Sequence, residues 1–146
     1  QLAVEAVAHG RGGNYSALAD DGATSSQART AAMLLSAATQ HLDEDDAEEA
    51  IATATTALGH FRQLGDRKGV ADSVRVVLSG YGLQDRMQES WSMATDELAA
   101  FRAAGDRRGM AAMLVPIAEV ELQERRADDA LRSASDARAL AAELGD

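Results

Sequence analysis

The stretch GDRKG at residues 65–69 returns almost unchanged as GDRRG at residues 105–109, 40 positions further along the chain. The pair Gly145-Asp146 stands another 40 positions on, where a third copy would begin. Each copy follows an apolar helical segment, at residues 61–64, 101–104 and 140–144. Self-similarity at one fixed spacing is typical of repeat arrays. This internal repeat therefore predicts the architecture of the chain better than it predicts a binding partner.

Aligned at this spacing, the chain divides into an irregular arm at residues 1–24 and a helical-repeat domain at residues 25–146, with repeats at 25–64, 65–104 and 105–146. Small or apolar residues recur in the same columns at steps of three and four residues, the spacing of one helix face. The columns are Ala31/Ala71/Ala111, Leu34/Val74/Leu114, Ala38/Leu78/Ala118, Ala50/Ser90/Ala130, Ala54/Ala94/Ala134 and Leu58/Leu98/Arg138, where Arg138 breaks the pattern. Each repeat is therefore predicted to be two antiparallel helices. The expected helices cover residues 27–41, 47–64, 70–79 with an extension to 83 left open, 87–104, 110–123 and 127–144.

The repeated stretch is predicted to be the corner between two helices. A glycine that ends a helix adopts positive φ without strain. The aspartate after it can cap the next helix by accepting a hydrogen bond from a free backbone N–H. A phosphate-binding loop is the alternative, but that motif needs a preceding strand and a Ser or Thr after the basic residue. Neither copy has them, so the corner is favoured.

The composition favours an all-α protein and excludes several functional classes. The chain has no cysteine, which rules out disulfides, thiolate metal sites and a cysteine nucleophile. Its net charge of −10 argues against nucleic acid and against an anionic membrane surface as main partners. The longest apolar run, residues 110–118, is too short to span a bilayer. No cofactor is expected. Because the chain starts at Gln1 rather than Met, its compartment, cytoplasm or the matrix or stroma of an organelle, stays open. Because the chain stops where the next repeat would start, we expect a piece of a longer array, or an array whose later part is not shown.

Candidate sites for metal binding and catalysis are weak. The acidic run at residues 43–49 suggests a calcium loop, but its sixth and twelfth positions from Asp43 are Glu48 and Ala54 instead of glycine and glutamate. A helix start is predicted there, with weak cation binding or a basic partner as the minor alternative. The three histidines form no ligand pair, and no nucleophile motif accompanies the serines. We therefore expect no metal site and no enzyme.

The pattern resembles the tetratricopeptide-repeat family, whose unit is a helix pair of usually about 34 residues, and is similar to its longer-period members. The family's leucine–glycine pair is matched by Ala37-Ala38, Val77-Leu78 and Ile117-Ala118, and its close-packing alanine by Ala50, Ser90 and Ala130. Its following tyrosine is matched only by Tyr81, its large aromatic is alanine in every copy, and its turn glycine is replaced by Asp45, Asp85 and Arg125. The resemblance implies a right-handed α-solenoid of about three helix pairs whose concave face, lined by the first helices, binds a peptide or a protein surface.

The resemblance also implies which residues would contact a partner. These are Leu35, Thr39, Asp72, Arg75, Ser79, Val115 and Glu119, with Ala32, Ala112 and Leu122 on the same faces. The surface is mixed and has no repeated Lys/Arg clamp for an acidic tail, so it suits an extended or helical segment with a few apolar anchors. Alternatively, Asp72 and Arg75 are polar residues on a solvent-exposed helix face and bind no partner. Trp91, the single tryptophan, is expected to fill the gap between helix pairs or, if exposed, to be an interaction hot spot.

Three hypotheses for function follow. The first is a non-enzymatic protein–protein interaction module. The second is a structural or linker subunit of a larger complex, such as an organellar or membrane assembly. The third is a sensor or regulatory repeat segment of a large signalling ATPase or transcription regulator.

Overall fold

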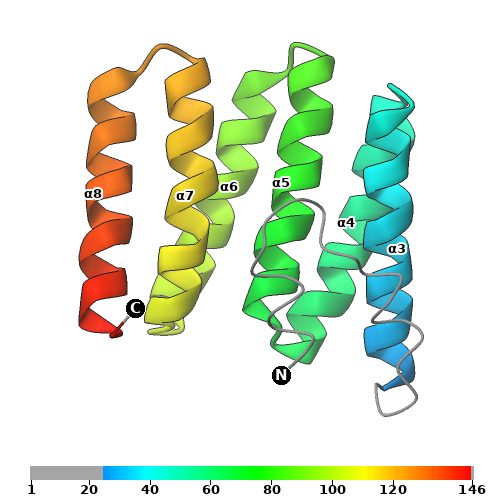
Figure 1. The fold of residues 1–146 in the computed structure, drawn as a ribbon, viewed down its shortest axis with the longest axis horizontal. Coiled ribbons are helices and arrows are strands. Elements are labelled where there is room, and N and C mark those ends of the chain that lie inside the picture. Colours follow the sequence, from blue (N-terminus) through cyan, green and yellow to red (C-terminus); the bar gives the residue numbers. More distant parts are fainter. Residues whose placement is uncertain (1–24, 146) are drawn as a thin grey trace. The chain divides into compact units, whose positions relative to one another are not determined.

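Residues 25–145 are described in a computed structural model, so the predicted arm at residues 1–24 lies outside the described part of the chain. These residues form six α-helices (Figure 1), and the all-α prediction is confirmed. The helices are α3 (Ser26–Asp43), α4 (Ala47–Leu64), α5 (Arg67–Leu83), α6 (Met87–Ala103), α7 (Arg107–Gln123) and α8 (Ala127–Glu143). They belong to two compact units, one ending at Gln84 and the other starting at Asp85. None of the six helices is long and apolar enough to cross a membrane.

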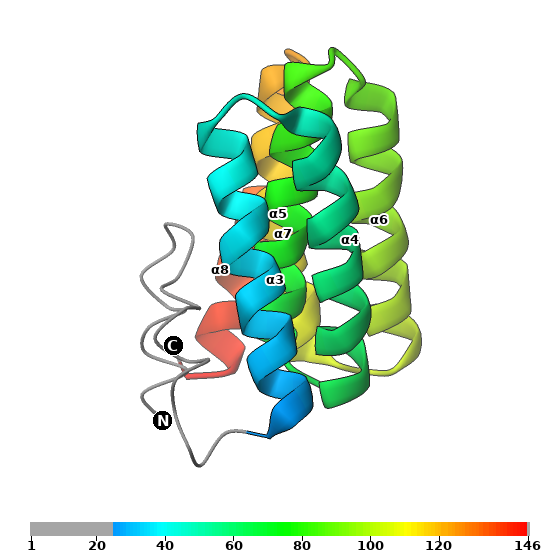
Figure 2. The same cartoon turned by 90° about the vertical axis from the view of Figure 1, so that its right-hand side faces the viewer.

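In the first unit α3 packs on α4 and α4 packs on α5, and α3 also contacts α5. Figure 2 shows α3 and α4 side by side with opposite directions. The buried face of α4 consists mostly of alanine, with Leu58 and Phe61 as its large members. Small side chains let helix backbones approach closely, which explains why the repeated columns are rich in alanine.

In the second unit α6 packs on α7 and α7 packs on α8. Its core is built mainly from α7, where Met113, Leu114, Ile117 and Val120 are buried. The last helix buries only Ala130, in the column that also holds Ala50 and Ser90. The three residues of this column are thus buried in both units.

The repeated stretch forms the corner that its sequence predicts. Gly65 and Gly105 both have φ of 68°, and Gly145 has φ of 82°. The Oδ1 atom of Asp66 accepts a hydrogen bond from the Gly69 N–H at 2.9 Å, and Asp106 does the same for Gly109 at 3.0 Å. The predicted starts of two helices were wrong. The helices α5 and α7 begin at Arg67 and Arg107, three residues before the predicted positions 70 and 110. The cause is that the second glycine lies inside the first helical turn, where the cap holds it.

The second glycine of each stretch is a packing residue. A Cβ atom on Gly69 would lie 2.1 Å from Cδ1 of Phe61, and one on Gly109 would lie 2.1 Å from Cδ1 of Phe101. Each phenylalanine ring of a second helix therefore rests on bare backbone at the start of the next first helix. A side chain larger than hydrogen would push the ring out of this position.

The turns inside each helix pair use left-handed backbone without glycine. Asp45, Asp85 and Arg125 have φ of 60°, 56° and 60°. Aspartate tolerates this region better than most residues, whereas a long side chain such as arginine is strained there. The turn geometry is thus the same in three places although the residue changes.

The second helices begin in two different ways. The Oδ1 atom of Asp46 caps α4 by accepting from the Glu49 N–H at 3.2 Å. At the same position α6 and α8 have Arg86 and Arg126, which provide no side-chain cap. Each arginine instead donates to an acidic residue three positions on, Glu89 at 3.2 Å and Asp129 at 3.1 Å. A hydrogen bond to its own backbone N–H, together with Arg86, lowers the pKa of the exposed Glu89 carboxyl.

We expect Gly69→Ala to lower the free energy of unfolding by about 1–3 kcal/mol, because the new methyl group overlaps the Phe61 ring. The control is Gly59→Ala on α4, where a Cβ meets no atom within 4 Å and the change should stabilise the helix by about 1 kcal/mol. Urea unfolding followed by circular dichroism measures both values. Equal effects of the two substitutions would contradict the packing role of Gly69.

A second stability prediction concerns two serines that are both 0% exposed. The Ser73 hydroxyl donates to the Gly69 carbonyl at 2.7 Å, while the Ser90 hydroxyl is buried without a hydrogen-bond partner among the described residues. We expect Ser90→Ala to raise the free energy of unfolding by up to about 1 kcal/mol, because it removes an unsatisfied polar group. Ser73→Ala should lower it by about 1 kcal/mol. Thermal and urea unfolding test this, and destabilisation by Ser90→Ala would refute it.

Candidate functional site

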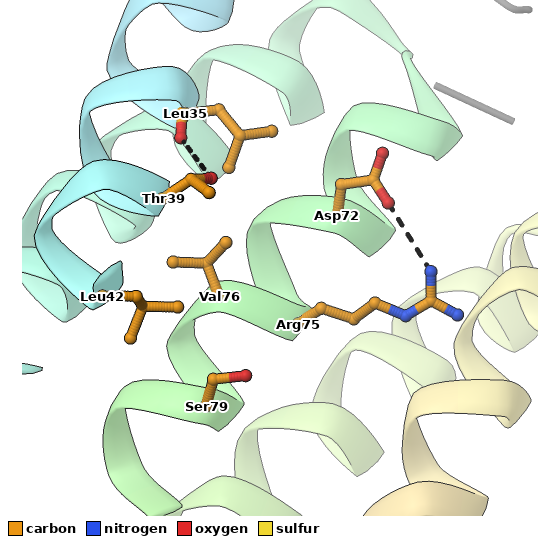
Figure 3. A pocket seen from close by; sticks show the side chains of 7 residues that line it. All are labelled: Leu35, Thr39, Leu42, Asp72, Arg75, Val76 and Ser79. Atoms are coloured by element: carbon orange, nitrogen blue, oxygen red, sulfur yellow. Dashed lines mark hydrogen bonds and ion pairs between the residues drawn. The ribbon is translucent and has the colours of Figure 1, made fainter. Parts of the chain in front are cut away.

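A groove of about 220 Å³ lies between α3 and α5 in the first unit. Its lining comes from both helices (Figure 3): Leu35, Thr39 and Leu42 of α3, and Asp72, Arg75, Val76 and Ser79 of α5. Because α4 runs antiparallel to both, α3 and α5 point in the same direction. The lining residues follow one another at three- and four-residue steps, so each helix contributes a single face.

The floor of the groove is apolar. Leu35 is 0% exposed and Val76 is 7% exposed, so both belong to the core of the unit. Leu42 is half-buried, and in Figure 3 its side chain and that of Val76 point into the space between the helices. The Thr39 hydroxyl donates to the Leu35 carbonyl at 2.9 Å, which leaves its methyl group available to the groove. An apolar side chain of a ligand would meet mainly the carbon atoms of Leu35, Leu42 and Val76 along this floor.

The α5 side of the groove is polar. A guanidinium nitrogen of Arg75 lies 3.7 Å from Oδ1 of Asp72, and the Arg75 side chain is 33% exposed against 12% for Asp72. Ser79 is exposed one turn further along the helix. The two charges largely compensate each other, so the middle of the groove has no strong preference for either sign.

The structure brings five of the seven predicted partner-binding residues to this groove, namely Leu35, Thr39, Asp72, Arg75 and Ser79. Leu35 and the neighbouring Ala32 are buried, so they leave little surface for a partner to contact. Val115 and Glu119 lie on one face of α7 in the second unit, where Val115 is 39% exposed and Leu122, on the same face, is 64% exposed. Ala112, also on this face, is half-buried.

Two lining residues were missed by the sequence analysis. Leu42 stands directly before the acidic run at residues 43–49 and was not among the predicted contact residues, although it follows Thr39 by three positions. Val76 lies next to Arg75 and points to the floor instead of the rim. The three- and four-residue steps from Leu35 and from Asp72 were the signal that could have identified both.

Trp91 lies in the second unit and is half-buried. The Cζ atom of Arg126 sits 5.0 Å from the centre of the indole ring. Arg126 is held in turn by Asp129, whose other carboxylate oxygen lies 3.4 Å from Arg132. One ring face is therefore covered by a guanidinium group, which is a cation–π arrangement.

The acidic and histidine side chains of the described residues do not gather into a metal-binding group. In residues 25–145 no group of three or more histidine and acidic side chains could hold a metal ion. Glu97 and Glu121 are buried carboxylates in the second unit, and Oε1 of Glu121 accepts a hydrogen bond from the Ser133 hydroxyl at 2.6 Å. The Glu121–Ser133 bond links α7 to α8. The acidic run contributes Asp46 as a cap and Glu48 and Glu49 as first-turn residues of α4, the helix-start geometry that was predicted.

Comparisons of the chain with protein-family models, with curated proteins and with solved structures give no significant match.

The cation–π arrangement gives a prediction with a built-in probe, because Trp91 is the only tryptophan. We expect Arg126→Ala to shift the Trp91 emission to longer wavelength and to lower stability by about 0.5–1 kcal/mol, since the ring loses its guanidinium cover. Arg132→Ala is the control, because it removes another arginine that pairs with Asp129 but does not stack on the ring. Fluorescence spectra of the two folded variants test this, and identical spectra would contradict it.

Proposed function

We propose that this chain is a non-enzymatic protein–protein interaction module that holds a short extended segment of a partner in the groove between α3 and α5. The single observation that supports it is the groove itself, an apolar floor with a compensated ion pair and a serine along one rim. Such a surface recognises an extended backbone with one or two apolar anchors.

The dimensions of the groove limit the ligand. From Leu35 to Leu42 the α3 side is about 10 Å long, at about 1.5 Å of rise per residue. An extended peptide advances about 3.3 Å per residue, so about three ligand residues lie within the groove. With volume for only one or two side chains, the contact is small, and the affinity of a single segment is expected to be modest.

We further propose that the helix pairs belong to the tetratricopeptide-like kind with a 40-residue period. The support is the spacing of the Gly-Asp corners, the left-handed turns at the same position of each pair and the buried small-residue columns. On this proposal Val115 and Glu119 form a corresponding contact face on α7 within the second unit. The partner is a protein or peptide and not a nucleic acid, in agreement with a net charge of −10.

A phage library of random linear heptapeptides tests the binding function, with selected peptides measured individually by fluorescence anisotropy. We expect Ser79→Tyr to weaken binding of the selected peptides at least about tenfold, because Ser79 is exposed and a tyrosine there fills the groove without touching the core. Thr56→Tyr, at an exposed position of α4 outside the groove, is the matched control and should leave binding unchanged.

The proposal fails if the library yields no enriched sequence. It also fails if peptides enriched on the native chain bind Ser79→Tyr and Thr56→Tyr equally well.

A further inference from the structure

One end of the α3–α5 groove is acidic, while its floor is apolar. Asp43 and Glu44 are the next two residues after Leu42, which lines the groove, and both are exposed. Asp43 follows Thr39 by four positions and therefore lies on the same face of α3 as the groove residues. Asp45 and Asp46 complete the turn, and no basic residue interrupts the stretch from 42 to 49.

The helix ends add to this negative potential. Both α3 and α5 end near this side of the groove, at Asp43 and Leu83, and a helix C-terminus carries roughly half a negative charge. No basic residue occupies the last turn of α5, and the last turn of α3 has only His41. The groove thus opens at this end onto two helix C-termini and a row of carboxylates, all of one sign.

The same end also exposes an apolar side chain. Leu83 is 57% exposed and follows Ser79 by four positions and Val76 by seven, which continues the groove face of α5. Leu42 and Val76 line the groove from its two sides, and Leu83 lies further along α5 on the face that carries Val76. The opposite end differs, because α5 begins there with Arg67 and Lys68.

We propose that the segment bound in this groove carries a large apolar side chain seated by Leu42, Val76 and Leu83, followed directly by a lysine or arginine that faces Asp43 and Glu44. This inference rests on the proposed function and names the chemistry of the partner. The apolar anchor supplies contact area, and the basic residue sets the direction in which the segment lies. An acidic segment is disfavoured, because its carboxylates would face like charges.

The test uses three amidated peptides of about seven residues, identical apart from two positions after a central leucine, which are Lys-Lys, Gln-Gln or Glu-Glu. At about 50 mM salt the Debye length exceeds 10 Å, and we expect the lysine peptide to bind at least about tenfold more tightly than the glutamate peptide. The glutamine peptide should lie between them. At about 0.5 M salt the difference should shrink severalfold, because the carboxylates are exposed.

Charge-reversal variants locate the effect. The double substitution Asp43→Lys with Glu44→Lys should reverse the preference, so that the glutamate peptide binds best. The control is Asp128→Lys with Asp136→Lys, an equal change of net charge at two exposed positions of α8, and it should leave the order of affinities unchanged. Circular dichroism confirms that each variant is folded before titration.

The outcomes separate this inference from the proposed function. If all three peptides bind equally and Ser79→Tyr still abolishes binding, the groove binds peptides without the inferred charge preference, and the inference is overturned alone. If the α8 control changes the preference as strongly as the variant at positions 43 and 44, net charge is the cause and the inference is again overturned. If no peptide binds in a manner that depends on Ser79, both proposals fail.

Discussion

The contact of a phenylalanine ring with bare glycine backbone is the constraint on which each unit of this structure depends. Phe61 lies on Gly69, and Phe101 lies on Gly109, with a separation that leaves no room for a Cβ atom. The ring belongs to the last turn of one helix and the glycine to the first turn of the next. A left-handed glycine and an aspartate cap lie between them, so the chain can reverse within a few residues and still bring the two helices into close contact. The stretch FRQLGDRKG therefore encodes a stop, a cap and a packing surface at once.

A second close approach at the other end of α5 fixes that helix against α4. A Cβ atom on Gly80 would lie 2.6 Å from Cγ1 of Ile51. Gly69 and Gly80 lie near the two ends of α5, and at each of them a side chain of α4 packs against the bare backbone of α5. Asp72, Val76 and Ser79 line the groove that separates α5 from α3. The groove is thus a by-product of tight packing elsewhere, because α3 and α5 both lie against α4 and cannot close completely on each other.

The sequence predicted the helices, corners and caps well, because each depends on residues that are close along the chain. A glycine can end one helix and the aspartate after it can cap the next, and steps of three and four residues mark one face of a helix. The sequence did not predict why the stretch has a second glycine, since the ring that needs it lies eight residues earlier across a corner. It also missed Leu42 and Val76, because their place in the groove depends on how α3 and α5 both contact α4. The stacking of Arg126 on Trp91 joins residues 35 positions apart and has no local signal.

The turns within the helix pairs adopt left-handed backbone without the glycine that usually occupies such a position. A left-handed turn usually takes glycine, and a long side chain there costs about 1 kcal/mol. This chain makes that turn with Asp45, Asp85 and Arg125, at almost the same φ each time. Since aspartate and arginine have little in common, the residue at the turn cannot be what sets its geometry. Within the units, the packing of α4 on α3 and of α8 on α7 sets it, and the column residues Ala50 and Ala130 near the starts of α4 and α8 are buried. A signature based on the turn glycine and a large aromatic in the second helix would therefore miss these pairs, although their backbone makes the same reversal. What identifies the architecture is the spacing of the corners and the small residues between them, because these decide how closely the helices can approach.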